Sequence, residues 1–287
     1  MKKIAVAGSL HYDIMIDAHH RPEKGETVMG TACRYKFGGK GGNQAISAAK
    51  SGAEVCFAGA VGTDEQGRFL VDTLRQAGID VSAVALVADC PSGMSVAISD
   101  EEGDYGAVVV SNANQQIPTN LFQGVQYWEN VGMLVLQNEI PEAVNMQAAI
   151  AAKQRDIPVC INAAPARPLG EQFAALIDIL IVNAIEARDM CGITVEDLAS
   201  AQRAATILAE RFDKVVVTAG EHGVAWCEAG VTAQTLHAQK VKLVSTHGAG
   251  DCFVGALCAS LTAGNSLAEA VVSANAAAAR HVSQSNV

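Results

Sequence analysis

Near its C-terminal end the sequence places two glycines and an alanine directly before an aspartate, in the stretch STHGAGDCF at 245–253. The residues that follow Asp251 are mostly apolar, which predicts a buried helix whose first turn contains this stretch. Small residues at the start of a helix leave backbone N–H groups open to a ligand, and the helix end adds a partial positive charge. We therefore expect the amides of Gly248, Ala249 and Gly250 to form an anion hole.

The carboxylate of Asp251 adds a second chemical capacity to this stretch. Beside an anion hole, a carboxylate can accept the proton of a hydroxyl group while the amides stabilise charge on a phosphoryl group. The simpler alternative is an aspartate that caps the first turn of the helix. The spacing alone leaves both roles open for Asp251.

A second glycine-rich stretch, FGGKGGNQA at 37–45, precedes another predicted helix. Its Gly-Lys pair is followed by Gly41 and not by Ser or Thr, which argues against a P-loop. The later stretch has Phe253 where a dinucleotide-binding fingerprint has its last glycine. The sequence therefore supports neither a P-loop ATPase nor a dehydrogenase.

Short apolar runs alternate with helical patterns along most of the chain. Runs such as KKIAVAG and DKVVVTAG predict buried strands. Between such runs, the stretch DEQGRFLVDTLRQAG has Phe69, Leu70, Leu74 and Ala77 at helical spacing, which predicts a helix with these residues on its apolar face. The alternation predicts an α/β fold with a mainly parallel central sheet that is covered by helices on both faces.

Two stretches interrupt this alternation. Residues 14–37 have no helical period, and residues 93–110 predict a hairpin that turns at 102–104. We expect both to form a small β-sheet lid that is inserted into a single domain of residues 1–287. The exposed edges of two such lids could pair into a homodimer, whereas surface hairpins without a function are the alternative.

The composition excludes several classes of protein. Half of the residues are apolar and 17% are charged, which is typical of a folded globular protein, and the net charge of −10 argues against nucleic acid or an anionic membrane as a partner. The first apolar run is too short for a signal peptide or a membrane span, so we expect a cytoplasmic protein. The eight cysteines include no C-x-x-C pair, which favours buried thiols over a zinc or redox site.

Over nearly its whole length the chain resembles the ribokinase-like, or phosphofructokinase-B type, family of carbohydrate kinases, and its pattern is most similar to that of ribokinase. Seven motifs occur in the family's order: GSLHYD (8–13), FGGKGGNQA (37–45), LQNE (136–139), NAAPA (162–166), NAIE (183–186), TAGEHG (218–223) and STHGAGDCF (245–253). The resemblance implies a three-layer α/β/α fold with a small β-sheet lid. It also implies an ATP-dependent enzyme that transfers the γ-phosphoryl group to a hydroxymethyl group of a small sugar.

The resemblance further implies roles for individual residues. Asp251 would be the general base, beside the anion hole of residues 248–250. The substrate would be bound by His11, Asp13, Gly39, Lys40, Asn43 and Glu139. ATP would be bound by Asn183, Thr218, Gly220, Gly223 and Asn275. Glu186 would bind Mg²⁺, most simply through water because magnesium gives up its water ligands reluctantly.

Taken one at a time, several of these residues have simpler roles. Asp13 could belong to a turn at the end of a strand, and Asn43 could cap the start of a helix. Glu186 could complement a helix dipole, and the glycines of 218–223 could form a hairpin turn. Asn275 could be a solvated residue on an alanine-rich helix.

The chain departs from the ribokinase pattern at two places. His11 stands where ribokinases usually have Asn, and because an imidazole differs in shape and titrates near neutrality, a nucleoside such as pseudouridine is an alternative acceptor. Ser245 stands where cation-activated members have Asp, and the final HVSQSNV lacks the Gly-Ala-x-x-Ser segment of their cation loop, so activation by K⁺ stays open. A sugar-binding protein that has lost catalysis is the lesser alternative.

Overall fold

The computed structural model describes residues 2–101 and 105–284 of the chain. Its large sheet contains nine strands: β1 (Lys3–Ala7), β4 (Val55–Gly62), β5 (Asp80–Val87), β8 (Val131–Gln137), β9 (Val159–Asn162), β10 (Ile179–Asn183), β11 (Lys214–Thr218), β12 (Gly223–Glu228) and β13 (Gln234–His237). Their spatial order is β13-β12-β11-β10-β9-β8-β1-β4-β5. All pairs from β11 to β5 are parallel, and β12 and β13 add antiparallel strands at one edge. The predicted mainly parallel sheet is therefore confirmed.

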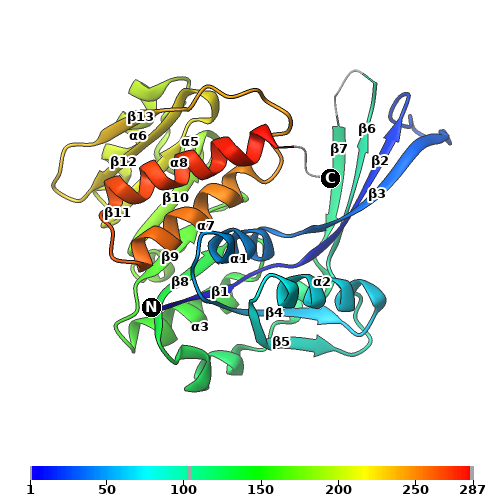
Figure 1. Cartoon of the computed structure of the whole chain (residues 1–287), viewed down its shortest axis with the longest axis horizontal. Coiled ribbons are helices and arrows are strands. Elements are labelled where there is room, and N and C mark those ends of the chain that lie inside the picture. The colour runs from blue at the N-terminus through cyan, green and yellow to red at the C-terminus, as the bar shows by residue number, and fades with distance from the viewer. Residues whose placement is uncertain (1, 102–104, 285–287) are drawn as a thin grey trace.

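Helices cover both faces of this sheet, as Figure 1 shows. One face carries α1 (Lys40–Lys50), α2 (Glu65–Gln76), α7 (Ala249–Thr262) and α8 (Leu267–Ser283). The other face carries α3 (Glu142–Lys153), α4 (Glu171–Ala174), α5 (Ala184–Cys191) and α6 (Leu198–Leu208). Four short 3₁₀ helices complete the described elements: η1 (Asn112–Gln116), η2 (Thr119–Gln123), η3 (Gln126–Trp128) and η4 (Gly220–His222).

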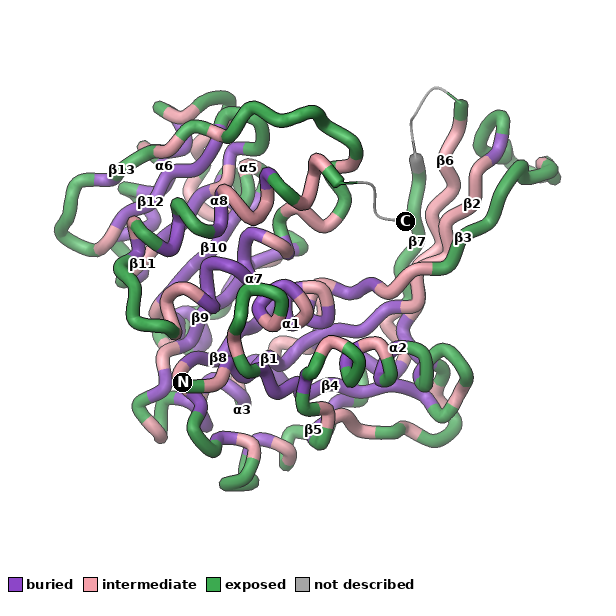
Figure 2. The backbone as a smooth tube through the Cα atoms, in the orientation of Figure 1, coloured by how far each residue is buried: buried purple, intermediate pink, exposed green. Residues whose placement is uncertain are grey.

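Alternate residues of the central strands enter two separate cores. In β1, Ile4 and Val6 pack on the side of α1 and α7, whereas Ala5 and Ala7 pack on the side of α3 and α6. This follows from the geometry of a strand, in which successive side chains point to opposite faces. Figure 2 shows the result as a buried central sheet between partly exposed helices. The three-layer α/β/α arrangement that the resemblance implied is thus observed.

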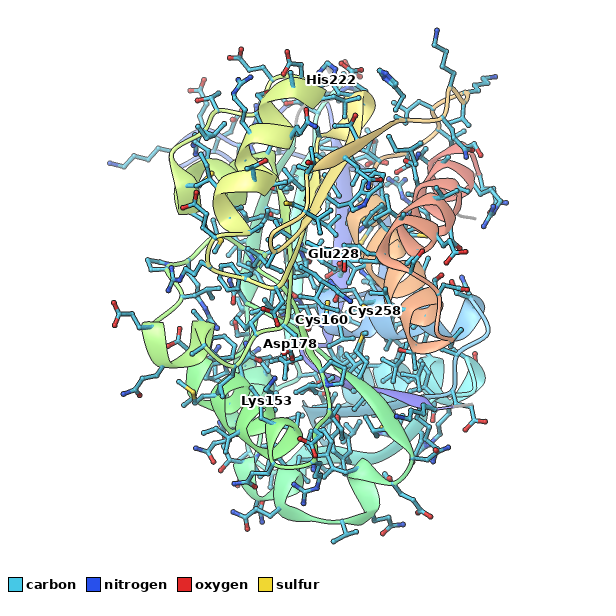
Figure 3. All side chains as sticks on the ribbon, turned by 90° about the vertical axis from the view of Figure 1, so that its left-hand side faces the viewer. Lys153, Cys160, Asp178, His222, Glu228 and Cys258 are labelled. Atoms are coloured by element: carbon cyan, nitrogen blue, oxygen red, sulfur yellow. The ribbon has the colours of Figure 1, made fainter. Side chains whose placement is uncertain are left out.

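Close packing fixes α7 against its neighbours. A Cβ atom on Gly255 would lie 2.5 Å from both the carbonyl oxygen of Gln44 and the Cβ of Ser47, so only glycine lets α7 cross α1 at this distance. On the side facing the sheet, the Sγ atom of Cys258 lies 3.8 Å from that of Cys160 on β9, and Figure 3 shows the two side chains in the interior. These contacts hold α7 at a fixed position over the sheet.

A second, smaller sheet projects from one side of the large one (Figure 1). Its strands are β2 (His11–Ala18), β3 (Gly30–Gly38), β6 (Met94–Ser99) and β7 (Tyr105–Val110), in the spatial order β3-β2-β6-β7. The outer pairs are antiparallel and the central pair of β2 with β6 is parallel, so the sheet is mixed. The predicted turn at 102–104 lies outside the described residues.

Two side chains differ in exposure from what the sequence predicts. Phe69 was expected on the buried face of its helix, yet it is 40% exposed and its ring packs edge-on against Tyr12 of the small sheet, with ring centroids 5.4 Å apart. Cys33 on β3 is exposed, in contrast to the expectation of buried thiols, because it lies on an edge strand of the small sheet. Among the described helices, none combines the length and apolar character that a membrane span requires.

Candidate active site

The first turn of α7 presents free backbone amides. Gly248 is the N-cap of this helix and has φ 75°, a left-handed conformation that favours glycine. The amide of Ala249 donates to the carbonyl of Thr246 at 3.2 Å, so the expectation that it belongs to the anion hole is wrong. Within the described chain, no acceptor is found for the amides of Gly248, Gly250 or Asp251. A Cβ on Gly250 would have no described atom within 4 Å, and Gly248, Gly250 and Asp251 all line a cavity.

Asp251 lies beside these amides and is 9% exposed. The N-cap of α7 is Gly248 and Asp251 lies within the first turn, which excludes the simpler role of an N-cap for Asp251. One carboxylate oxygen, Oδ1, accepts from Nε2 of Gln44 at 2.9 Å, and the other, Oδ2, lies 3.4 Å from Nδ2 of Asn43. Burial raises the pKa of Asp251, while the charge of Lys40 and the hydrogen bond from Gln44 lower it.

Glu139 joins the ends of three elements next to Asp251. Its Oε2 atom accepts from the amide of Lys40 at 2.8 Å and from the hydroxyl of Ser9. Gly39 is the N-cap of α1, so Lys40 is the first residue of that helix. The carboxylate therefore fixes the start of α1 to the carboxyl ends of β1 and β8.

The residues at the base of the small sheet lie on the same side of the site. The ring of His11 is buried, and its Nδ1 atom lies 3.9 Å from Oε2 of Glu139. Its Nε2 atom has no hydrogen-bond partner among the described residues. Asp13 accepts from the hydroxyl of Ser95 at 2.6 Å, and burial raises the pKa of this carboxyl overall. This side of the site thus offers a histidine and two carboxylates to a polar ligand.

On the other side of Asp251 lies a cavity of about 130 Å³. It is lined by Lys40, Asn162, Ala164, Ile181, Asn183, Glu186, Thr218, Gly248, Gly250, Asp251 and Val254. Most of these residues stand at the carboxyl ends of β9, β10 and β11 or at the start of α7. Such a crevice beyond the carboxyl ends of parallel strands is the usual ligand site of open α/β sheets.

Asn183 and Glu186 hold one another in this crevice. The side chain of Asn183 accepts from the amide of Glu186 at 3.0 Å, and Oε2 of Glu186 accepts from the amide of Asn183 at 2.7 Å. This is a capping box at the start of α5. Glu186 is buried, which raises the pKa of its carboxyl, and its Oε1 atom is the oxygen left for other partners.

The remaining residues of the predicted ATP site occupy one corner of the fold. Gly220 begins η4 after β11, and a Cβ on Gly223 would lie 2.1 Å from the carbonyl oxygen of Leu236, so close strand packing already requires this glycine. Asn275 is buried and its Nδ2 atom donates to the carbonyl of His237 at 3.0 Å. The alternative that Asn275 is solvated is therefore wrong, because this amide ties α8 to the end of β13.

A group of buried amides lies beneath Asp251 and was not predicted from the sequence. Gln44, Gln137 and Asn162 are each buried and hydrogen-bonded to one another or to Asp251. The available signal was the position of Gln44 on α1, where its neighbours one turn away, Gly41 and Ala48, are also buried. A polar residue on a buried helix face needs hydrogen-bond partners.

Comparisons with known proteins agree with this geometry. The model of the pfkB family carbohydrate kinases matches residues 1–287. The chain is 34% identical to ribokinase of Bacillus subtilis over 283 residues, which cover 98% of this chain and 93% of that protein. It is 31% identical to ribokinase of Haemophilus influenzae over 285 residues, which cover 99% of this chain and 93% of the relative.

Solved structures with a similar fold include ribokinases. A solved structure of Arabidopsis thaliana ribokinase complexed with ribose and ATP superimposes with a TM-score of 0.92 and 27% sequence identity, covering 100% of this chain and 94% of that one. A ribokinase structure from Cryptococcus neoformans in complex with ADP gives a TM-score of 0.87 at 27% identity, covering 99% and 95% of the two chains. Sequence motifs, fold and the crevice at α7 agree, and the chain belongs to the pfkB family of carbohydrate kinases.

Proposed function

We propose that this protein is an ATP-dependent kinase of the ribokinase type, which phosphorylates a hydroxymethyl group of ribose or a closely similar sugar. The observation that carries the proposal is the buried carboxylate of Asp251 beside the free amides of Gly250 and its own backbone. A base and an anion hole at one point are the two groups that direct phosphoryl transfer to a hydroxyl requires. The ribokinase relatives supply the class of sugar.

The sugar would lie between Asp251 and the base of the small sheet. Asp13, Asn43 and Glu139 would bind its hydroxyl groups, since carboxylates accept and amides donate hydrogen bonds. His11, Gly39 and Lys40 would complete this side, and the small sheet would cover the sugar as a lid.

The chemical step would be a direct in-line transfer without a covalent enzyme intermediate. Asp251 would accept the proton of the attacking hydroxyl. The amides of Gly248, Gly250 and Asp251 would stabilise the negative charge that develops on the transferred phosphoryl group, and Lys40, which lines the cavity, would add a positive charge. ATP would occupy the cavity beyond them, with Asn183, Thr218, Gly220, Gly223 and Asn275 around it.

The residues of the site fit a hydrated Mg²⁺ ion. The described residues contain no group of three or more His, Cys, Asp or Glu side chains that could hold a metal ion alone, which suits an ion bound mainly by water and phosphate oxygens. Glu186 is the one protein ligand we assign, through water from its Oε1 atom. When bound, Mg²⁺ would neutralise charge on the phosphates of ATP.

The loop before α7 does not fit a K⁺ site. The hydroxyl of Ser245 accepts from the amide of His247 at 3.3 Å, and the carbonyl of His247 accepts from Nε2 of His281 at 2.8 Å. Each of these oxygens already accepts one hydrogen bond, and a ring N–H directed at the carbonyl would oppose a cation there. We therefore propose that the enzyme works without K⁺.

We further propose that two copies pair through their small sheets and that the protein works in the cytoplasm, without nucleic acid as a partner. The edge strand β7 supports the pairing, because Val108, Val109 and Val110 on it are 67%, 54% and 45% exposed. An unpaired edge with exposed apolar side chains is a template for another strand. Sedimentation at several protein concentrations checks this assignment, and a monomer at all of them would contradict it.

Substitution of Asp251 by Asn tests the proposed function. Loss of the base should lower kcat with ribose by about 10²-fold to 10⁴-fold, while calorimetry should give an ATP affinity within about threefold of that of the parent protein. An active Asp251→Asn protein would refute the assignment of the base. A panel of ribose, fructose, pseudouridine and inosine tests which acceptor is phosphorylated. Turnover of a nucleoside and of no sugar would change the assigned acceptor from ribose to a nucleoside.

A further inference from the structure

Three buried side-chain amides lie in a row beneath Asp251, and we call them the amide row: Gln137 at the end of β8, Gln44 on α1 and Asn162 at the end of β9. Gln44 is 1% exposed and stands at the centre of the row. Its Nε2 atom donates to Oδ1 of Asp251 at 2.9 Å and to Oδ1 of Asn162 at 3.0 Å. Its Oε1 atom accepts from Nε2 of Gln137 at 2.9 Å. Both ends of the Gln44 amide are thus satisfied inside the protein.

Only one direction of the row gives Gln44 partners at both ends of its amide, while Oε1 of Gln137 has no partner among the described residues. An ionised carboxylate can only accept hydrogen bonds, so the NH₂ group of Gln44 must face Asp251. Its carbonyl then faces Gln137, whose NH₂ group is the donor. A flip of Gln44 would place its oxygen against the oxygens of Asp251 and Asn162 and its NH₂ group against that of Gln137, at a cost in three buried hydrogen bonds.

The far end of the row is held in place by close packing. A Cβ atom on Gly8 would lie 2.2 Å from Oε1 of Gln137, so the backbone of β1's carboxyl end packs directly on this amide. The backbone carbonyl of Gln137 accepts from Nδ2 of Asn145 at 2.7 Å. The side-chain amide of Gln137 thus packs on the end of β1 and its backbone is tied to α3, and it contacts Gln44 through a single hydrogen bond.

The two oxygens of Asp251 therefore have different surroundings. Oδ1 receives the short hydrogen bond from Gln44, whereas Oδ2 has only the longer contact of 3.4 Å with Asn43. At Oδ1 a proton would compete with the Gln44 donor, whereas Oδ2 has only the weaker contact with Asn43 and is the more available oxygen. The cavity that is lined by Asp251 and Gly250 gives a reactant access to this carboxylate.

We propose that Gln44 is a positioning residue for the proposed kinase reaction: it fixes the plane of the Asp251 carboxylate and makes Oδ2 the oxygen that accepts the proton of the acceptor hydroxyl. The inference rests on the proposed function, because it assigns a role only if Asp251 is the base. The same hydrogen bond favours the ionised carboxylate and so offsets part of the effect of burial.

The test compares Gln44→Met with the parent protein in steady-state assays over pH 5 to 9 with saturating ATP. Methionine has a similar length and no hydrogen-bonding amide. We expect kcat to fall by about 10-fold to 100-fold, the loss typical of one hydrogen bond to a charged group, with both KM values changed by less than about threefold. The acid limb of the pH profile should move to higher pH, because loss of the donor disfavours the ionised carboxylate.

Gln202→Met is the matched control. Gln202 lies on α6, on the opposite face of the sheet, and its Nε2 atom donates to the carbonyl of Ala233 at 2.6 Å. This variant should leave kcat, KM and the pH profile unchanged. If Gln44→Met does not fold, Gln44→Glu preserves size and still tests the inference, since a second carboxyl beside Asp251 should move the acid limb in the same direction.

A double-mutant cycle separates this role from a general effect on the fold. In the Asp251→Asn background, Gln44→Met should lower the residual kcat by less than about twofold, because there is no longer a base to position. Full additivity in the cycle, or an unchanged pH profile in Gln44→Met and Gln44→Glu, would overturn the inference while leaving the kinase assignment intact. A parent protein that phosphorylates no acceptor would instead refute the proposed function itself.

Discussion

Two glycines of α7, Gly250 and Gly255, should have different effects when each is replaced by alanine: one change should affect activity and the other stability. A Cβ on Gly250 would have no described atom within 4 Å, and Gly250 lines the cavity next to the free amides. A Cβ on Gly255 would lie 2.5 Å from the backbone of α1 at Gln44. The first change should impair the reaction and spare the fold, whereas the second should destabilise the fold.

The structure gives the size of each effect. For Gly250→Ala, alanine favours the helical backbone by at most about 1 kcal/mol over glycine, so the free energy of unfolding should stay constant or rise slightly. The added methyl group would hold a phosphoryl group away from the amides, and loss of one such donor costs about 10²-fold to 10³-fold in kcat. For Gly255→Ala, overpacking at the helix crossing should cost about 1 to 3 kcal/mol, which lowers Tm by about 2 to 10 °C in a chain of this size.

Thermal unfolding followed by circular dichroism and steady-state kinetics with ribose and ATP test both variants. Gly250→Ala should unfold at the temperature of the parent protein and show the larger loss of kcat. Gly255→Ala should unfold earlier and recover much of its activity at lower temperature. Full activity in Gly250→Ala would refute the anion hole at the start of α7, and an unchanged Tm in Gly255→Ala would refute the close crossing of α1 and α7.

Two further predictions concern the start of α2 and the loop before α7. Asp64 caps α2 by accepting from the amide of Gly67 and also accepts from Ser92, and although burial raises its pKa, these hydrogen bonds lower the pKa overall. The contribution of Asp64 to the free energy of unfolding should therefore be present at neutral pH and be lost as pH falls through the lowered pKa. In urea unfolding at pH 7, Asp64→Ala should lower the free energy of unfolding by about 1 kcal/mol. As a control, replacement of the exposed Asp72 by Ala should lower it by less than about 0.5 kcal/mol. The activity of the parent protein should change by less than about twofold when K⁺ replaces tetramethylammonium in the buffer. Strong activation by K⁺ would contradict the assignment of the loop before α7. His281→Ala, which removes the hydrogen bond to the carbonyl of His247, should raise the KM for ATP.

The layers of the fold were predictable because each central strand is an uninterrupted apolar run. Such runs require cover on both faces, and the helical patterns between them supply it. The exposure of Phe69 was not predictable from its own helix, since it depends on where the small sheet lies. The same is true of the parallel pairing of β2 with β6, which joins segments that a local hairpin pattern does not connect.

The site was predictable as far as strand ends determine it. Residues that follow parallel strands meet at one edge of the sheet, so motifs after β8, β10 and β11 had to lie together. The spacing also placed the free amides near Gly248. It could not decide which of them are free, because the hydrogen bond of Ala249 to Thr246 depends on the left-handed conformation of Gly248.

The amide row shows most clearly why the remainder was out of reach. Gln44 is separated from Gln137 by 93 residues and from Asp251 by 207, so no local pattern connects them. The sequence alone could mark Gln44 as a polar residue on a buried helix face and infer that it must have partners. Only the crossing at Gly255 decides that the partner is the carboxylate of Asp251. The three amides stand in motifs that the sequence shows, but packing decides which partners they have, and we infer that one of them leaves Oδ2 of the proposed base as the more available oxygen.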